Sequence, residues 1–108
     1  FFAECLSHQI VASELGLDIR KKESPFQGVQ QEIDWFGRTE IVGFYNTFVA
    51  LDGQVDSSFE IRSDFDPKEV LALRGSYFCT TQFHPESILT PNGFQIIQDI
   101  LLRLIRRT

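Results

Sequence analysis

The chain has 108 residues, a size that allows one hydrophobic core and excludes two independently folded domains. Hydrophobic residues make up 43% and charged residues 23% of the sequence, a composition typical of a packed globular domain rather than a disordered segment. The net charge of -5 does not suit a nucleic-acid partner. Apolar runs are far shorter than the ~20 residues of a membrane-spanning helix, so no membrane association is expected.

The first half of the chain predicts a strand, a helix and further strands. Residues 1–3 are typical of the end of a buried strand. The helix that follows places Leu6, Ile10 and Val11 on one apolar face, and Gly16 is suited to end it. Alternating or β-branched segments then predict strands at residues 17–22, 29–35 and 39–49, the last broken near residue 43 or 46.

The second half continues the strand pattern and ends in a helix. Strands are expected at residues 59–62, 70–73 and 77–83, with a turn at residues 64–68. Thr90 is the expected N-cap of the closing helix, and apolar residues then recur at helical spacing up to Arg106 and Arg107. The pattern predicts an α/β domain with an antiparallel segment between its two helices.

Cys5 stands at the junction between the first strand and the first helix. Backbone N–H groups converge there and the helix dipole favours a thiolate, which makes a nucleophile at this place reactive. The sharp turn of such an elbow needs small residues two positions before and after the nucleophile, and these are Ala3 and Ser7. A lone cysteine is more often a small buried hydrophobe; that interpretation stays open for Cys5 and is preferred for Cys79.

His84 is the second candidate for a catalytic role, because it follows an apolar strand and precedes Pro85 and Glu86. An imidazole suits general-base catalysis at neutral pH, and a carboxylate on its other nitrogen fixes the tautomer. Cys5, His84 and Glu86 would then form a catalytic triad. Cys5 and His84 are far apart in sequence, so only the fold can bring them together.

Two segments resemble motifs of the class I glutamine amidotransferases. Residues 2–9, Phe-Ala-Glu-Cys-Leu-Ser-His-Gln, resemble the nucleophile elbow of that family. Residues 82–87, Gln-Phe-His-Pro-Glu-Ser, are similar to the segment that carries its catalytic histidine and glutamate. Thr90, Gly93 and the closing helix are also similar to the end of that domain, so the resemblance covers the whole chain. The sequence differs from the family at residues 3 and 7, where alanine and serine replace the usual glycines.

The resemblance implies a mixed sheet flanked by helices, the flavodoxin-like fold of that family, truncated at its N-terminus. Residues 1–108 would form the C-terminal portion of one amidotransferase domain. Cys5 would be the nucleophile on the side-chain amide of glutamine, His84 the general base and then acid, and Glu86 the residue that orients His84. The backbone N–H of Leu6 would contribute to the oxyanion hole. The positions that hold glutamine in the family are matched by Gln9, Thr47 and Phe48.

Residues 27–30 and 43–48 are similar to the amidotransferase domain of phenazine-biosynthesis enzymes, which are relatives of anthranilate synthase. This implies that ammonia from glutamine aminates chorismate in a synthase domain or subunit, giving 2-amino-2-deoxyisochorismate or anthranilate. It also implies no cofactor and no metal in this domain, magnesium in the partner synthase domain, and a dimer in the complete protein. Two cysteines are too few for a disulfide framework, so a cytoplasmic location is expected.

Two alternatives stay open. The first takes Cys5, His8, His84 and Glu86 as zinc ligands, since thiolate, imidazole and carboxylate groups all suit that metal. The second is a catalytically silent relative that only binds or regulates a partner subunit. Glu4 fits an active enzyme least well, because a carboxylate beside the nucleophile raises the pKa of the thiol unless the carboxylate side chain points away from it.

Overall fold

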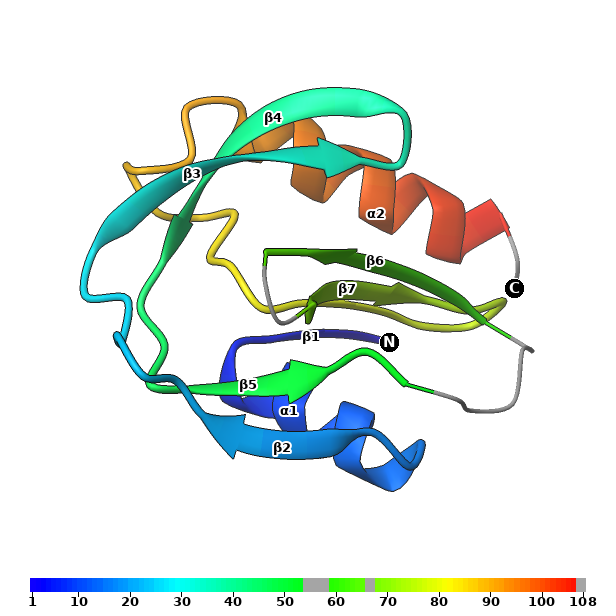
Figure 1. Cartoon of the computed structure of the whole chain (residues 1–108). Helices are drawn as coiled ribbons and strands as arrows, with labels where there is room; N and C mark the ends of the chain where they lie inside the picture. Colours follow the sequence, from blue (N-terminus) through cyan, green and yellow to red (C-terminus); the bar gives the residue numbers. More distant parts are fainter. Residues whose placement is uncertain (54–58, 66–67, 107–108) are drawn as a thin grey trace.

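The computed structural model describes residues 1–53, 59–65 and 68–106. Its helices are α1 (Leu6–Glu14) and α2 (Gly93–Arg106) (Figure 1). Its strands are β1 (Phe2–Glu4), β2 (Asp18–Lys21), β3 (Val29–Trp35), β4 (Arg38–Phe44), β5 (Phe48–Leu51), β6 (Glu60–Asp64), β7 (Glu69–Arg74) and β8 (Cys79–Thr81). Parts of the expected turn at residues 64–68, and Arg107, lie outside the described residues. No helix in these ranges is long and apolar enough to cross a membrane.

Six strands form one mixed sheet in the order β1-β8-β7-β5-β2, with β6 also paired to β7. β1 and β8 run parallel, with Glu4 level with Thr81, whereas the other pairs in this sheet are antiparallel. The remaining strands, β3 and β4, form a separate hairpin. Because parallel strands end at the same edge of a sheet, the residues that follow β1 and β8 are brought close together.

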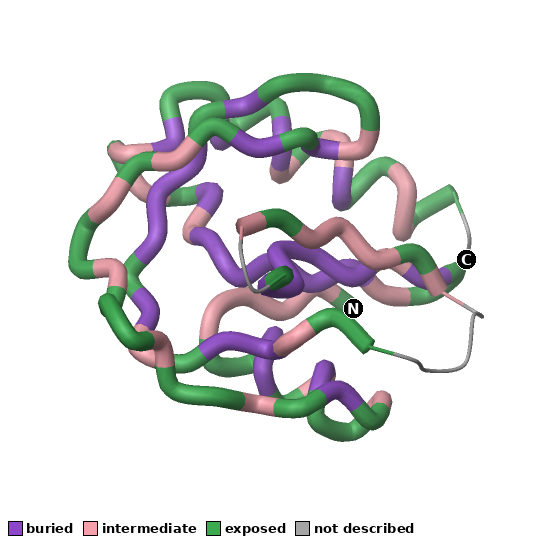
Figure 2. The backbone as a smooth tube through the Cα atoms, viewed as in Figure 1, coloured by how far each residue is buried: buried purple, intermediate pink, exposed green. Residues whose placement is uncertain are grey.

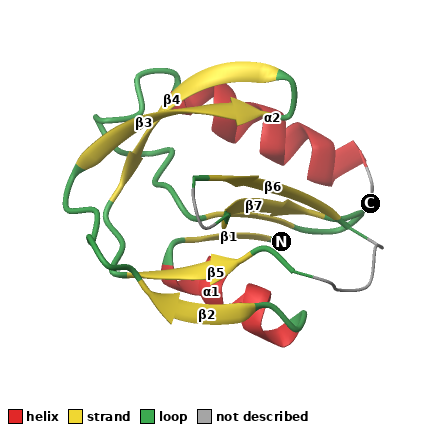
Figure 3. Cartoon of the chain, in the orientation of Figure 1, coloured by secondary structure: helices red, strands yellow, loops and turns green. Residues whose placement is uncertain are grey.

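The core consists of two hydrophobic clusters. In Figure 3 the strands β1, β6 and β7 of the larger sheet lie between α1 and α2. One cluster joins the β3–β4 hairpin, β7, β8 and α2, and it includes Phe44, Phe83 and Ile96. The other packs α1 against β5 and β7, and it includes Ala12 and Val70. Figure 2 shows buried residues along β7. This strand contributes side chains to both clusters.

The buried face of α1 differs from the one that its apolar spacing predicts. Leu6 and Ile10 are 66% and 56% exposed, whereas His8 and Gln9 are buried. His8 Nδ1 lies 2.7 Å from the Thr80 hydroxyl, and its Nε2 also has a partner, a backbone carbonyl of β7. The expectation was wrong for Leu6 and Ile10 but holds for Val11, which packs against the core cluster of Ala12. Buried polar side chains with hydrogen-bond partners take the place of Leu6 and Ile10 on the sheet.

The start of α2 is fitted against the segment that carries His84. The helix begins at Gly93, later than expected, and Thr90 is not its N-cap. Instead, the Thr90 hydroxyl donates to the His84 carbonyl at 2.8 Å and accepts the N–H of Gly43 at 2.9 Å. A Cβ at Gly93 would stand 1.7 Å from the Pro85 carbonyl oxygen, so only glycine permits this approach.

Candidate active site at the edge of the sheet

Cys5 is the single residue between β1 and α1. Its φ of 53° and ψ of -112° form a backbone conformation that residues with a side chain rarely adopt. The N–H of Cys5 donates to the Thr81 carbonyl at 2.8 Å, which anchors the turn to the end of β8. The sharp elbow expected between Ala3 and Ser7 is therefore confirmed, and it leaves the thiol partly exposed.

The thiol of Cys5 has polar groups on several sides. It receives a hydrogen bond from the backbone N–H of Leu6, and Gln82 Nε2 lies 3.9 Å from its Sγ. Burial raises the pKa of the Cys5 thiol, the Leu6 N–H lowers it, and the negative charges of Glu4 and Glu86 raise it further. The net effect is a pKa above the ordinary value for cysteine, so the thiolate expected at the start of the helix is not favoured, because burial outweighs the Leu6 N–H. The nucleophile therefore needs a nearby base.

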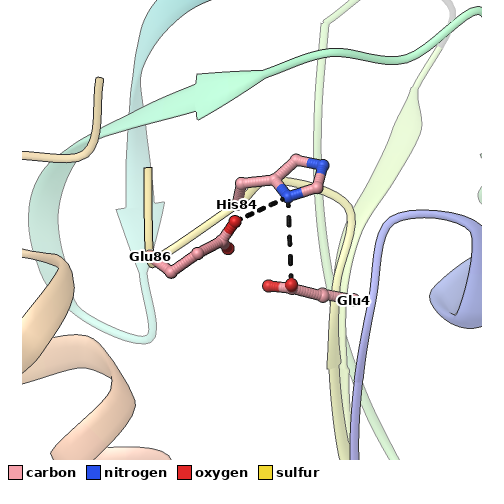
Figure 4. A group of neighbouring side chains, drawn as sticks. All are labelled: Glu4, His84 and Glu86. Carbon is pink, nitrogen blue, oxygen red and sulfur yellow. Dashed lines mark hydrogen bonds and ion pairs between the residues drawn. The ribbon is translucent and has the colours of Figure 1, made fainter. Parts of the chain in front are cut away.

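The ring of His84 presents one nitrogen to two carboxyl groups (Figure 4). Its Nδ1 lies 3.0 Å from Glu86 Oε2 and 3.9 Å from Glu4 Oε1. Its Nε2 has no hydrogen-bond partner among the residues that the structure describes. When the Nδ1–H donates a hydrogen bond to Glu86, Nε2 is the nitrogen that can accept a proton from a nucleophile.

The backbone around His84 is held by three neighbours. Its N–H donates to the Gly43 carbonyl at 2.9 Å, and its carbonyl accepts from Thr90 Oγ1 and from the N–H of Ser87. The Tyr45 ring meets the imidazole edge to face at 5.4 Å, and its hydroxyl lies 3.1 Å from Ser87 Oγ. Sequence reasoning assigned no part in the site to these neighbours, although residues 43–48 had been matched to a family motif.

The three predicted catalytic residues thus gather at one edge of the sheet. The charge of Glu86 acts on the Cys5 thiol, and Glu86 accepts a hydrogen bond from His84. Cys5 and His84 share no hydrogen bond within the described part of the chain. The arrangement supplies a thiol, an imidazole with a free nitrogen, and a carboxylate that orients the imidazole, which are the groups required for acyl transfer.

Of the residues expected to hold glutamine, Gln9 lies one helical turn from Cys5, and its N–H donates to the Cys5 carbonyl at 3.1 Å. Gln9 Nε2 donates to the Phe48 carbonyl at 2.8 Å and to Gln82 Oε1 at 2.9 Å. The Thr47 carbonyl accepts the N–H of Lys22 at 2.8 Å. Because these groups are engaged within the chain, contact of Gln9, Thr47 and Phe48 with a substrate stays a prediction. Gln82 was missed as a site residue, although an amide at the end of an apolar strand must find partners when it is buried.

The alternative zinc site is not assembled. His8 is fully buried, and both nitrogens of its ring have partners in the sheet. Three other residues, Glu4, His84 and Glu86, each have one possible ligand atom, and these atoms lie within 4.8 Å of one another. The hydrogen bonds within this group account for its spacing without an ion.

Two other features lie away from this edge. Cys79 in β8 is 1% exposed, and burial raises its pKa to about 12, so it is a core thiol as expected. A cavity of about 540 Å³ opens beside β2 and β5, next to the ion pair in which Lys22 Nζ and Glu69 Oε2 lie 2.8 Å apart. None of the three predicted catalytic residues lines this cavity.

The chain is similar to known sequences over nearly its whole length. The sequence model of the family described as "Glutamine amidotransferase class-I" matches residues 1–104. A phenazine-specific anthranilate synthase of Pseudomonas chlororaphis is 47% identical over 114 residues, which cover 100% of this chain and 18% of that protein. Aminodeoxychorismate/anthranilate synthase component 2 of Bacillus subtilis is 28% identical, over 93% of this chain and 57% of that protein. The chain therefore spans from under a fifth to somewhat over half the length of these relatives.

Solved structures show the same fold. A glutamine amidotransferase of Thermotoga maritima superposes with a TM-score of 0.64 and 13% identity, over 99% of this chain and 54% of that one. A Thermoplasma acidophilum protein assigned as part of a GMP synthase superposes with a TM-score of 0.78 and 16% identity, over 97% of this chain and 57% of that one. These matches confirm the expected α/β fold with a mixed sheet.

Proposed function

Because this chain belongs to the class I glutamine amidotransferase family, we propose that it provides a glutaminase site whose ammonia aminates chorismate in a synthase domain or subunit. The observation that supports this function is the gathering of Cys5, His84 and Glu86 at the edge where β1 and β8 end. The choice of chorismate follows from the names of the relatives, which are anthranilate and aminodeoxychorismate synthases. The proposal includes no cofactor in this domain, magnesium in the synthase domain, and a dimeric protein.

The proposed reaction is an acyl transfer through a thioester. His84 Nε2 takes the proton of the Cys5 thiol, and the sulfur attacks the side-chain amide carbon of glutamine. The N–H of Leu6 stabilises the negative oxygen of the tetrahedral intermediate. His84 then protonates the nitrogen, the C–N bond breaks and ammonia leaves. Water, deprotonated by His84, attacks the thioester; the C–S bond breaks, and glutamate and the free thiol are formed.

The decisive experiment separates ammonia production from ammonia use. In the intact protein that contains this chain, Cys5→Ser is expected to abolish glutamine-dependent amination of chorismate but to leave amination by ammonium salts largely intact. Cys79→Ser is the matched control, because that thiol is buried away from the site, and it should retain both activities. Loss of both activities in a folded Cys5→Ser protein would contradict the role of Cys5.

We also propose that residues 1–108 are the C-terminal portion of one amidotransferase domain. β1, the strand that leads to Cys5, pairs only with β8 within the described residues and lies at the edge of the sheet. An edge strand exposes unpaired backbone groups, which favours aggregation, and here that edge carries the nucleophile. Residues 1–108 expressed alone should therefore show no glutaminase activity, whereas a version extended upstream should be active and unfold cooperatively. Equal glutaminase rates in the two would refute this assignment.

A further inference from the structure

Glu4 is the last residue of β1 and directly precedes Cys5. In the parallel pairing it lies opposite Thr81, the last residue of β8. From there its side chain reaches the loop that follows β8, where Oε1 lies 3.9 Å from His84 Nδ1 (Figure 4). An oxygen of the Glu4 carboxyl group also lies within 4.8 Å of a Glu86 oxygen, close enough for the two groups to interact directly. Two carboxyl groups from different parts of the chain therefore meet at the same nitrogen of one imidazole.

The Glu4 and Glu86 carboxyl groups share one proton, because two negative charges this close repel each other. Burial raises the pKa of Glu4 to about 7; the hydrogen bond and charge of Glu86 add to the increase, and His84 opposes it. Burial also acts to raise the pKa of Glu86, but hydrogen bonds with Glu4, with its own backbone and with His84 hold it below its ordinary value. Below about pH 7 the shared proton is therefore carried by Glu4, and Glu86 is the carboxylate.

The protonated Glu4 carboxyl group can act as a hydrogen-bond donor to Glu86. As a neutral acid it donates its O–H to Glu86, which in turn accepts from His84 Nδ1. We propose that Glu4 is a positioning residue of the glutaminase site: protonated, it holds Glu86 against His84, and ionised, it loosens that contact and adds a negative charge beside Cys5. This inference rests on the function proposed above.

The surroundings of Glu4 leave its charge largely unopposed. The titratable groups that face it are Cys5 on the adjoining turn, and His84 and Glu86 on the segment after β8. The Tyr45 ring covers the imidazole from the segment between β4 and β5. Within the described ranges its one ion-pair partner is His84, and no lysine or arginine pairs with it. Ionisation of Glu4 therefore acts directly on the nucleophile, whose pKa its charge already raises.

The first test measures the alkylation of Cys5 by iodoacetamide against pH, in the intact protein, by mass spectrometry. Glu4→Gln keeps the size and a hydrogen-bond donor but cannot ionise. We expect Cys5 of this variant to react at lower pH, and roughly three- to tenfold faster at pH 8, than in the wild type, because a nearby negative charge is removed. Buried Cys79 serves as the unreactive reference. Superimposable profiles would overturn the proposal, whether or not the protein hydrolyses glutamine.

The second test separates the position of Glu86 from the charge of Glu4. Glu4→Leu is neutral like Glu4→Gln but lacks the donor, so its alkylation profile should match that of Glu4→Gln while its kcat for glutamine hydrolysis is roughly tenfold lower, with a similar KM. Wild-type kcat is expected to decline above pH 7, where Glu4 ionises, and Glu4→Gln should lack this decline. Equal kcat values for the two folded variants would overturn the positioning role. If the wild-type protein hydrolyses no glutamine through Cys5, the proposed function and the positioning role of Glu4 are both refuted. The alkylation profiles would still show whether the charge of Glu4 acts on Cys5.

Discussion

Gln9 Nε2 donates a hydrogen bond to Gln82 Oε1 at 2.9 Å, and this bond joins α1 to the segment after β8 across 73 positions of sequence. The second amide proton of Gln9 goes to the Phe48 carbonyl, and Gln82 Nε2 lies 3.9 Å from Cys5 Sγ. Both side-chain amides are buried. Exchanging the nitrogen and oxygen of either amide would therefore leave its hydrogen-bond partners unsatisfied. A chain of amides thus leads from β5 to the thiol.

The first prediction concerns Gln82. Gln82→Leu removes the acceptor of a buried amide proton, which should lower the free energy of unfolding by about 1–3 kcal/mol in a urea titration. It should also slow the alkylation of Cys5, because the thiolate loses a donor. Gln98→Leu, on the exposed side of α2, is the control and should change stability by less than about 0.5 kcal/mol. Equal stability of the two variants would show that the amide chain contributes nothing.

A second prediction ranks the two residues after β8. His84→Ala should lower kcat for glutamine hydrolysis by roughly 10²- to 10⁴-fold, because the base itself is lost. Glu86→Ala should be milder, because it disturbs the orientation of His84 and leaves the imidazole in place. Steady-state kinetics of the intact protein test the order, with Glu32→Ala on the exposed side of β3 as control. Wild-type kcat in His84→Ala would exclude the triad.

A third prediction addresses the approach of α2 to the catalytic segment. Gly93→Ala places a Cβ where the Pro85 carbonyl oxygen lies, so the helix or the segment must move. We expect the free energy of unfolding to fall by about 1–3 kcal/mol and glutaminase activity to fall with it. Gly53→Ala is the matched control, since no atom of the described residues lies within 4 Å of its added Cβ. Thermal unfolding that is unchanged in Gly93→Ala would contradict the close contact.

A fourth prediction follows from His8. Burial lowers its pKa to about 4, against the opposing hydrogen bond to the Val70 carbonyl. In the unfolded chain a histidine titrates near pH 6.5, so between pH 6.5 and 4 only the unfolded state binds this proton. Stability should therefore decrease as the pH falls through this window, by about 3 kcal/mol at most. Urea titrations at several pH values test it. His8→Gln should lack this component, and identical pH dependence of the two proteins would refute it.

Much of the local structure could be predicted from the sequence. Strict alternation predicted β3, helical periodicity predicted α2, and the small residues around Cys5 predicted the elbow, because each pattern reflects the geometry of a single element. A break in the strand expected at residues 39–49 was placed near residue 43 or 46, and the structure has it between Phe44 and Phe48. The family motifs identified Cys5, His84 and Glu86 as the candidate triad, since each motif is a short continuous segment.

The partners of the polar side chains were decided only by the tertiary structure. The hydroxyl of Thr90 binds the His84 carbonyl rather than capping α2, and α1 buries His8 rather than Leu6. The meeting of Glu4 with His84 depends on the parallel pairing of β1 with β8, which joins residues from opposite ends of the chain. No local period encodes such contacts, because strand order and register determine which buried donor finds which acceptor.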